Sequence, residues 1–237
     1  MILNDNKKVL LVTGSSRGIG KYVAKHYCAL NYTVIGCSRS VGTIEHSNYH
    51  HKCLDISLEK EIIELFKYIR QEFKRLDVLV NNAAINPAIC SGALLPYATM
   101  EKIFRVNVFA PMLFCREAIK LMLRNKSGRI INIGSMAAKH EVAGEGLYTS
   151  TKSALNSYTR VLAKEVSKLG ITVNVVAPAA IKTELSAQIN QAALTEVLSR
   201  NAISQYGELA DVTNTLDFLI NADSSTITGQ IIYLGGA

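Results

Sequence analysis

A glycine-rich turn, TGSSRGIG at residues 13 to 20, lies between a short run of Val and Leu and a helical stretch. The run KKVLLVT (7 to 13) predicts a strand, KYVAKHYCAL (21 to 30) predicts a helix, and YTVIGCS (32 to 38) predicts the next strand. A strand, a tight turn, a helix and a second strand within about 30 residues are typical of a βαβ unit. Glycines in such a turn bring the backbone close to a pyrophosphate at the N-terminus of the helix.

The alternation of strands and helices continues along the rest of the chain. After residue 56 a helix places Ile62, Leu65, Phe66, Ile69 and Phe73 on one face at helical spacing. The remaining segments are expected strands at 52 to 56, 76 to 82, 129 to 134, 171 to 177 and 230 to 234, and expected helices at 99 to 124, 147 to 168 and 184 to 220. The pattern predicts an α/β fold: a single doubly wound parallel sheet of the Rossmann type with helices on both faces, forming one domain over residues 1 to 237.

Composition excludes several classes of function. The 237 residues are 49% hydrophobic without any 18-residue apolar stretch, and the N-terminus runs from a polar segment into a strand without a leader, so we expect a cytoplasmic protein and no membrane partner. The net charge of +7 comes from scattered residues without an aromatic-interleaved basic stripe, which disfavours nucleic acid. An anionic cofactor or an acidic partner protein explains the charge at least as well.

Cysteine and histidine spacing does not indicate a metal. The cysteines contain no C-x-x-C pair and are interpreted as free, mostly buried thiols: Cys28, Cys37, Cys53, Cys90 and Cys115. The group His46, His50, His51 and Cys53 matches no zinc pattern, so these histidines are predicted to be solvated loop residues.

The end of the second strand predicts the choice of cofactor. An acidic residue about 20 residues beyond the glycines would hold a free ribose 2′-hydroxyl, and this chain has Cys37, Ser38 and Arg39 there instead. Arg39 can pair with a phosphate in bidentate fashion, and Arg17 offers a second guanidinium. NADP(H) is therefore favoured over NAD(H), although single arginines commonly just face solvent.

Three residues suggest proton and hydride transfer to a carbonyl. The Tyr148 phenol can donate a proton to the alkoxide that hydride arrival creates, and Lys152 lies one helical turn along on the same face, where its ammonium is expected to lower the phenol's pKa. Ser135, after the strand-like RIINIGS, can hydrogen-bond the substrate oxygen. Each has a structural alternative: a Tyr-x-x-x-Lys pair is commonplace, and a Ser after a strand is often a helix cap.

Taken together, these motifs resemble the short-chain dehydrogenase/reductase family over essentially the whole chain. The matching segments are TGSSRGIG, the DIS at 55 to 57, NNAA at 81 to 84, Asn107, Ser135 and YTSTK. The resemblance implies that Asn107, Ser135, Tyr148 and Lys152 form the catalytic set, with Asn107 supporting a proton-relay water and Lys152 also holding the nicotinamide ribose. Asn107 could instead simply satisfy a backbone group. The cofactor contacts implied are Gly14, Ser15, Ser16, Arg17, Gly18, Ile19, Gly20, Arg39, Asp55, Ile56, Asn82, Ala83, Ala84, Tyr148, Lys152, Pro178, Ile181 and Thr183.

Within the family the chain looks most like the 3-oxoacyl-[acyl-carrier-protein] reductases, which implies a 3-oxoacyl thioester substrate and possibly an acyl carrier protein as partner. Lys126 occupies one basic position for that carrier, and Lys168 lies beside the second. Alanines replace family glycines at Ala84 and Ala179, which is tolerable where φ is negative. A biosynthetic ketoreductase acting on another ketone and a non-catalytic NADP(H)-binding regulatory subunit remain alternatives. Apolar surface on the helices at 99 to 124 and 147 to 168 predicts a homo-oligomer, by resemblance a tetramer.

Overall fold

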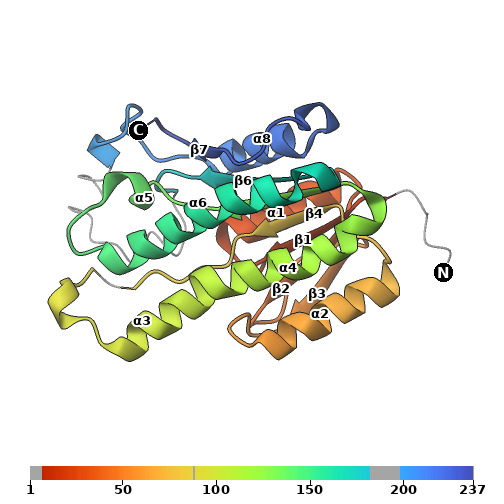
Figure 1. The fold of residues 1–237 in the computed structure, drawn as a ribbon, viewed down its shortest axis with the longest axis horizontal. Helices are drawn as coiled ribbons and strands as arrows, with labels where there is room; N and C mark the ends of the chain where they lie inside the picture. Colours follow the sequence, from red (N-terminus) through yellow and green to blue (C-terminus); the bar gives the residue numbers. More distant parts are fainter. Residues whose placement is uncertain (1–6, 88, 182–197, 237) are drawn as a thin grey trace.

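The computed structural model describes residues 7–87, 89–181 and 198–236, and its strands form one parallel sheet (Figure 1). The sheet order is β3-β2-β1-β4-β5-β6-β7, and every neighbouring pair is parallel. The strands are β1 (Val9–Thr13), β2 (Thr33–Ser38), β3 (Tyr49–Cys53), β4 (Val78–Asn81), β5 (Gly128–Ile133), β6 (Ile171–Ala177) and β7 (Ile231–Tyr233). The predicted single doubly wound sheet is confirmed, whereas one domain over the whole chain stays a prediction.

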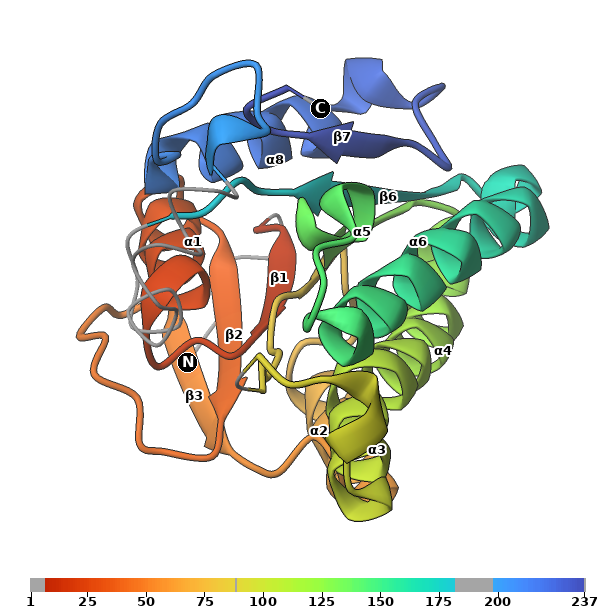
Figure 2. The same cartoon turned by 90° about the vertical axis from the view of Figure 1, so that its left-hand side faces the viewer.

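Helices cover both faces of this sheet, as Figure 2 shows, with α1 on one side and α2, α4 and α6 on the other. The α-helices are α1 (Gly18–Ala29), α2 (Glu59–Glu72), α3 (Tyr97–Phe104), α4 (Ala110–Met122), α5 (Ala137–His140), α6 (Gly146–Val166) and α8 (Leu209–Ile220). Short 3₁₀ turns lie at Gly92–Leu94, Leu123–Asn125, Ser167–Leu169 and Ala222–Ser224. None of the helices within the described ranges is long and apolar enough to cross a membrane.

Alternation along β1 explains how one short strand serves two hydrophobic cores. Val9 and Leu11 pack into the cluster formed with α2, α4 and α6, while Leu10 and Val12 pack into the cluster formed with α1 and α8. All four side chains are at most 3% exposed. Burial on both faces is the reason that the strand reads as a continuous apolar run rather than as an alternating one.

The predicted boundaries fail where the sheet has an edge and where a turn interrupts a helix. The third strand was expected at 52 to 56, but β3 begins at Tyr49, so His50 and His51 are strand residues and the loop interpretation was wrong for both. As an edge strand, β3 is partly exposed and lacks the apolar run of the central strands. His46 does lie in a loop.

Two predicted helices are also interrupted. The expected helix at 99 to 124 consists of α3, a π-helical turn at Arg105–Phe109 and α4. The expected helical region at 184 to 220 is wrong for residues 201 to 208, where Gly207 forms a parallel bridge with Ile181. A capping box between Glu208 and Asp211 then starts α8. The part at 184 to 197 lies outside the described residues.

A partly buried hydrogen bond joins α1 to α8. The Tyr27 hydroxyl donates to Asp217 Oδ1 at 2.7 Å, and His26 Nε2 lies 2.9 Å from Asp217 Oδ2. Tyr27 is 1% exposed, and burial, reinforced by Asp217, raises the pKa of its phenol. The phenol is therefore a donor throughout the physiological pH range.

We predict that Tyr27→Phe lowers the free energy of unfolding by about 1 to 3 kcal/mol, because it removes a hydrogen bond to a charged acceptor. Urea unfolding measures the change. Tyr22→Phe, on the exposed side of the same helix, is the matched control and should be close to neutral. Equal effects of the two substitutions would contradict the assigned role of the Tyr27–Asp217 bond.

Candidate active site

A cavity of about 850 Å³ opens at the carboxyl ends of β1, β2 and β4. The strands that follow β1 in the sequence, β2 and β3, lie on one side of it, and β4 to β7 lie on the other side. The crevice therefore lies where the strand order reverses, which is the usual ligand position in such sheets. Many of the residues expected to bind a dinucleotide line it: Gly14, Ser16, Arg17, Gly18, Ile19, Arg39, Asp55, Ile56, Asn82, Ala83 and Ala84.

The glycine-rich turn has the backbone conformation that its sequence indicates. Gly14 and Gly18 have φ values of 70° and 52°, in the left-handed region that favours glycine. A Cβ on Gly20 would overlap the Gly14 carbonyl oxygen, so α1 approaches the turn closely only because this position is glycine. Gly14 N donates to Cys37 O at 2.8 Å, which ties the turn to the end of β2.

Side chains from β1 and from the end of β4 hold the turn in place. Asn82 Nδ2 donates to Thr13 O at 2.8 Å, and the backbone N–H groups of Asn82 and Ala83 both donate to Thr13 Oγ1 at 2.9 Å. The sequence did not identify Thr13 as a site residue. Thr13 is 2% exposed, and its hydroxyl bonds to residues that are far away in the sequence. Ala84 and Ala179, which replace family glycines, both have negative φ values. The backbone therefore accepts an alanine at both positions without strain.

Basic residues gather at the far end of the cavity. Arg39 follows β2, while Lys102 and Arg105 enter the lining from α3 and the π-helical turn, with Glu101 beside them in an ion pair to Arg105 at 2.8 Å. Lys102 and Arg105 were missed, because the sequence showed only that they lie in a helix. Asp55 faces this group: hydrogen bonding to Ser57 lowers the pKa of its carboxyl, and Arg39 and Lys102 lower it further.

The catalytic candidates meet beyond the ends of β5 and in α6. Ser135 follows β5, and its side chain is close enough to the Tyr148 phenol to lower the pKa of that phenol. Ser135 Oγ also accepts from Ala137 N at 3.1 Å, so the capping alternative is present alongside the contact with Tyr148. Lys152 Nζ lies 5.7 Å from the centre of the Tyr148 ring and donates to Ile133 O at 2.7 Å. The structure therefore brings Ser135, Tyr148 and Lys152 into one cluster, in which Tyr148 and Lys152 are buried and Ser135 is half-buried.

Burial controls the acidity of this cluster. It raises the pKa of Tyr148 to about 12, against a lowering by the nearby Ser135 side chain, and it lowers the pKa of Lys152 to about 8. The expected lowering of the phenol's pKa by Lys152 is not found, and burial is the largest influence on each of the two groups. The result is a protonated phenol beside an amine whose pKa is near neutrality.

Asn107 lies in the π-helical turn between α3 and α4, where Ala110 N donates to Arg105 O, five residues back. Its side chain accepts from Ile85 N and donates to Ile85 O, both at 2.9 Å, and it also donates to Thr151 Oγ1 at 3.2 Å. The alternative that Asn107 satisfies backbone groups is therefore observed directly. It fastens the loop after β4 to the helix that carries Lys152.

Other expected site residues lie apart from the cavity wall. Ser15 and Gly20 are buried behind the turn, Pro178 O accepts from Met136 N at 3.2 Å, and Ile181 packs into the core beside α1 and α8. Thr183 lies outside the described residues. Of the described His, Cys, Asp and Glu residues, none form a group of three or more that could hold a metal ion.

The two lysines considered for carrier binding lie at the opposite edge of the sheet. Lys126 precedes β5 and Lys168 precedes β6, whereas Ser135 follows β5 at the carboxyl edge. Both lysines are exposed. Six strand residues separate the two edges, a distance of roughly 20 Å. Lys126 and Lys168 therefore lie away from Ser135 of their own chain.

The fold and the site define a dinucleotide-binding oxidoreductase, and comparison with known proteins gives its family. A family model described as short chain dehydrogenase matches residues 8–194. The chain therefore belongs to the short-chain dehydrogenase family and acts on CH–OH or C=O groups.

Individual relatives are similar over nearly the whole chain. The 3-oxoacyl-[acyl-carrier-protein] reductase FabG of Buchnera aphidicola subsp. Baizongia pistaciae is 32% identical, with 99% of this chain and 98% of the relative covered. Carbonyl reductase family member 4 of Xenopus laevis is 33% identical, with 97% of each covered. The solved structure of ElxO with NADP bound is 31% identical with a TM-score of 0.88, covering 96% of this chain and 97% of that chain. These similarities support the expected resemblance to FabG and the expected cofactor, NADP(H).

Burial of Lys152 has a consequence for stability. Its pKa is about 8 in the folded chain against an ordinary 10.5, so the unfolded state binds more protons between these values and stability rises with pH there. Below about pH 8 the folded protein carries the full penalty of a buried charge. We predict that Lys152→Met raises the free energy of unfolding by about 1 to 3 kcal/mol near pH 7, and that this gain shrinks toward pH 10.

Urea unfolding at the two pH values measures this difference. Lys164→Met, at an exposed position of the same helix, is the control and should change stability little at either pH. A Lys152→Met protein less stable than the native chain near neutrality would show that the bond to Ile133 O outweighs the burial penalty.

Proposed function

We propose that this chain reduces a ketone to a secondary alcohol with NADPH. The single observation that carries the proposal is the cluster of Ser135 with the buried Tyr148 and Lys152 at the carboxyl edge, next to a dinucleotide-sized cavity. A proton donor, a hydrogen-bond donor and an amine at this edge are the groups that carbonyl reduction requires. The remaining cofactor contacts proposed from the sequence, Pro178, Ile181 and Thr183 among them, belong to the same proposal.

NADPH is proposed over NADH because the cavity lacks the carboxylate that a free 2′-hydroxyl would need at the end of β2. Arg39 lies there, Arg17 lies in the glycine-rich turn, and both line the cavity. Guanidinium groups pair with phosphate in bidentate fashion. The structural neighbour ElxO, which was solved with NADP bound, supports the same choice.

The residues of the cluster have distinct proposed tasks. NADPH, when bound, supplies the hydride. Ser135 Oγ donates a hydrogen bond to the carbonyl oxygen and holds it in position, and Tyr148 transfers its phenolic proton to that oxygen as the alkoxide forms. A pKa of about 12 keeps the phenol protonated before the reaction. Lys152, with a pKa of about 8, can return a proton toward the tyrosine at neutral pH and binds the ribose.

The substrate proposed first is a 3-oxoacyl thioester, reduced to the 3-hydroxyacyl thioester, because several relatives are named 3-oxoacyl-[acyl-carrier-protein] reductase. Acyl carrier protein is the proposed partner. With Lys126 and Lys168 at the amino edge of the sheet, these lysines could meet a carrier at an active site only if a second subunit presents them. A cytoplasmic location stays a prediction from the sequence.

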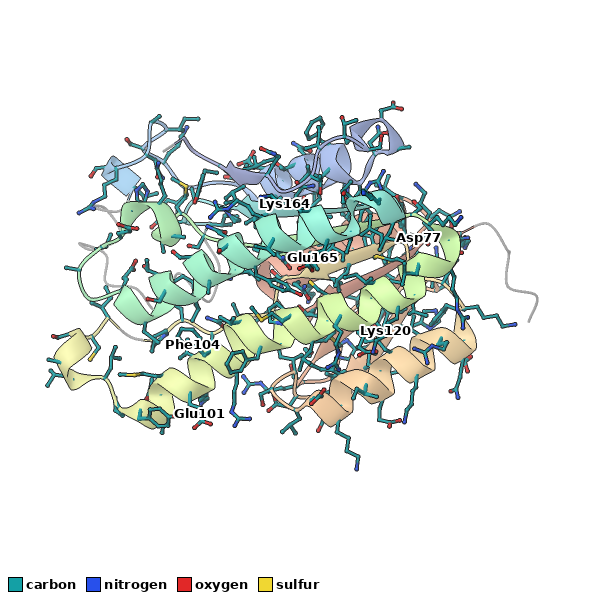
Figure 3. The ribbon with its side chains drawn as sticks, viewed as in Figure 1. Asp77, Glu101, Phe104, Lys120, Lys164 and Glu165 are labelled. Atoms are coloured by element: carbon teal, nitrogen blue, oxygen red, sulfur yellow. The ribbon has the colours of Figure 1, made fainter. Side chains whose placement is uncertain are left out.

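A homotetramer is proposed from the outer surface of α4 and α6, which form the front of the molecule in Figure 3. The large apolar side chains of Phe109, Leu123 and Val161 are 52%, 42% and 53% exposed on these helices and their ends. Lys120 and Lys164 lie on the same two helices (Figure 3). Large exposed apolar side chains on two neighbouring helices are typical of a surface that is covered by another subunit.

We predict that Tyr148→Phe lowers kcat for ketone reduction by about 10²- to 10⁴-fold, because it removes the proton donor. NADPH oxidation with an acetoacetyl thioester and with simple ketones measures the rate and tests substrate preference. Tyr158→Phe, ten residues along the same helix, is the matched control. Tight NADPH binding by the native chain without turnover of any ketone would favour the regulatory subunit, and turnover of simple ketones alone would favour a different biosynthetic ketoreductase.

We predict that Arg39→Ala weakens NADPH binding by about ten- to a hundredfold, because a charge-assisted contact to the 2′-phosphate is lost. NADH, which lacks that phosphate, should bind with nearly unchanged affinity. Fluorescence titration of both cofactors measures the two dissociation constants. Arg70→Ala on α2 is the control for a lost surface charge. A native chain that prefers NADH would overturn the cofactor proposal.

A further inference from the structure

A chain of side-chain hydrogen bonds connects the glycine-rich turn to the turn after β2. Ser15 Oγ lies 2.9 Å from the Tyr49 hydroxyl, which lies 2.7 Å from His51 Nδ1. On the other side of the ring, His51 Nε2 lies 2.9 Å from Ser40 O and 3.2 Å from Ser38 Oγ. The mechanism described above uses neither Tyr49 nor His51.

The Ser40 carbonyl and a neutral His51 ring together set the direction of these hydrogen bonds. Because the Ser40 carbonyl can only accept, His51 Nε2 must carry a proton. When the ring is neutral, Nδ1 accepts from the Tyr49 hydroxyl, which accepts in turn from Ser15 Oγ. Ser38 Oγ donates to Ser40 O at 2.8 Å and can accept from the imidazole. With a neutral imidazole, each side chain in this series of hydrogen bonds therefore meets a partner of the opposite kind, a donor facing an acceptor.

Two glycines leave the space that this arrangement occupies. A Cβ on Gly36 would overlap both the Tyr49 hydroxyl and Ser15 Oγ, and a Cβ on Gly42 would lie 2.6 Å from Cγ and Nδ1 of His51. A side chain at either position would force the backbone to move or would displace one of these hydrogen-bonded side chains. The hydrogen bonds therefore require glycine at both positions.

The part held by His51 is the part that presents Arg39. Ser38, Arg39 and Ser40 all line the cavity, whereas His51 lies behind them and outside its lining. Arg39 is exposed, so its backbone is anchored through its two neighbours. We propose that His51 is a positioning residue that holds the Ser38–Ser40 turn so that Arg39 meets the 2′-phosphate, and thereby sets the preference for NADPH over NADH.

This inference rests on the proposed cofactor and explains how its recognition is preorganised. Holding a loop in its binding conformation gains affinity because the ordering cost is met before the ligand arrives. The contacts that both dinucleotides would share are those to the glycine-rich turn and to the Asn82 region, which also line the cavity. Loosening the Ser38–Ser40 turn should therefore weaken the contact with the 2′-phosphate far more than the contacts that NADPH and NADH share.

Equilibrium binding of NADPH and NADH to the full chain tests the proposal. His51→Leu removes all three ring hydrogen bonds and is expected to weaken NADPH binding about tenfold while changing NADH binding less than about twofold. His51→Gln keeps a donor and an acceptor and should restore most of the NADPH preference. His50→Leu is the matched control, because His50 lies next along β3 and packs on Phe73 with ring centres 5.1 Å apart.

Equal weakening for both cofactors would show a merely structural role and would overturn the proposal, as would an unchanged NADPH affinity in His51→Leu. A glutamine variant no better than the leucine variant would also count against it. Because binding is measured without a ketone, failure of ketone reduction would leave this result intact. A native chain that binds NADH more tightly would instead reject the proposed cofactor itself.

Discussion

Parallel pairing of β1 with both β2 and β4 is the constraint on which the site depends. Val12 pairs with Gly36 on one side and with Val80 on the other, so the turns after the three strands arrive at one edge. The chain continues from β1 toward β3 in one direction and from β4 toward β7 in the other, which leaves a crevice between the two sets of turns. Both faces are covered by helices, so this edge is where the glycine-rich turn, Arg39 and Asn82 can meet a common ligand.

Burial has opposite effects on the two titratable groups at the proposed reaction centre. It keeps the Tyr148 phenol protonated and brings the pKa of Lys152 down to about 8, and both shifts disfavour the charged forms. A reductase of the proposed kind needs a protonated donor and a nearby group that exchanges protons at neutral pH. Water exclusion therefore prepares the acid chemistry, and it does so at a cost in stability that the buried lysine carries.

At the proposed adenosine end of the cavity the charged side chains are exposed and the backbone is held in place. Arg17 and Arg39 are exposed. The turns that carry them are held by hydrogen bonds of Thr13 and Asn82 and by the series of hydrogen bonds that runs from Ser15 through Tyr49 and His51 to Ser40. The turns that carry these long charged side chains are already arranged before an anion binds. Hydrogen bonds between neutral groups, most of them partly buried, thus position exposed charges.

The sequence by itself determined the central strands and the glycine-rich turn, because apolar periodicity and the steric needs of a turn are encoded in neighbouring residues. Its resemblance to a known family supplied the four catalytic candidates. Tertiary structure alone decided that Lys102 and Arg105 line the cavity, that Asn107 fastens Ile85, and that His51 lies in an edge strand behind Arg39. It also decided the direction of the Tyr148 pKa shift, which spacing on a helix had suggested would be downward. These features depend on burial and on partners far away in the sequence, and the pattern of neighbouring residues predicts neither.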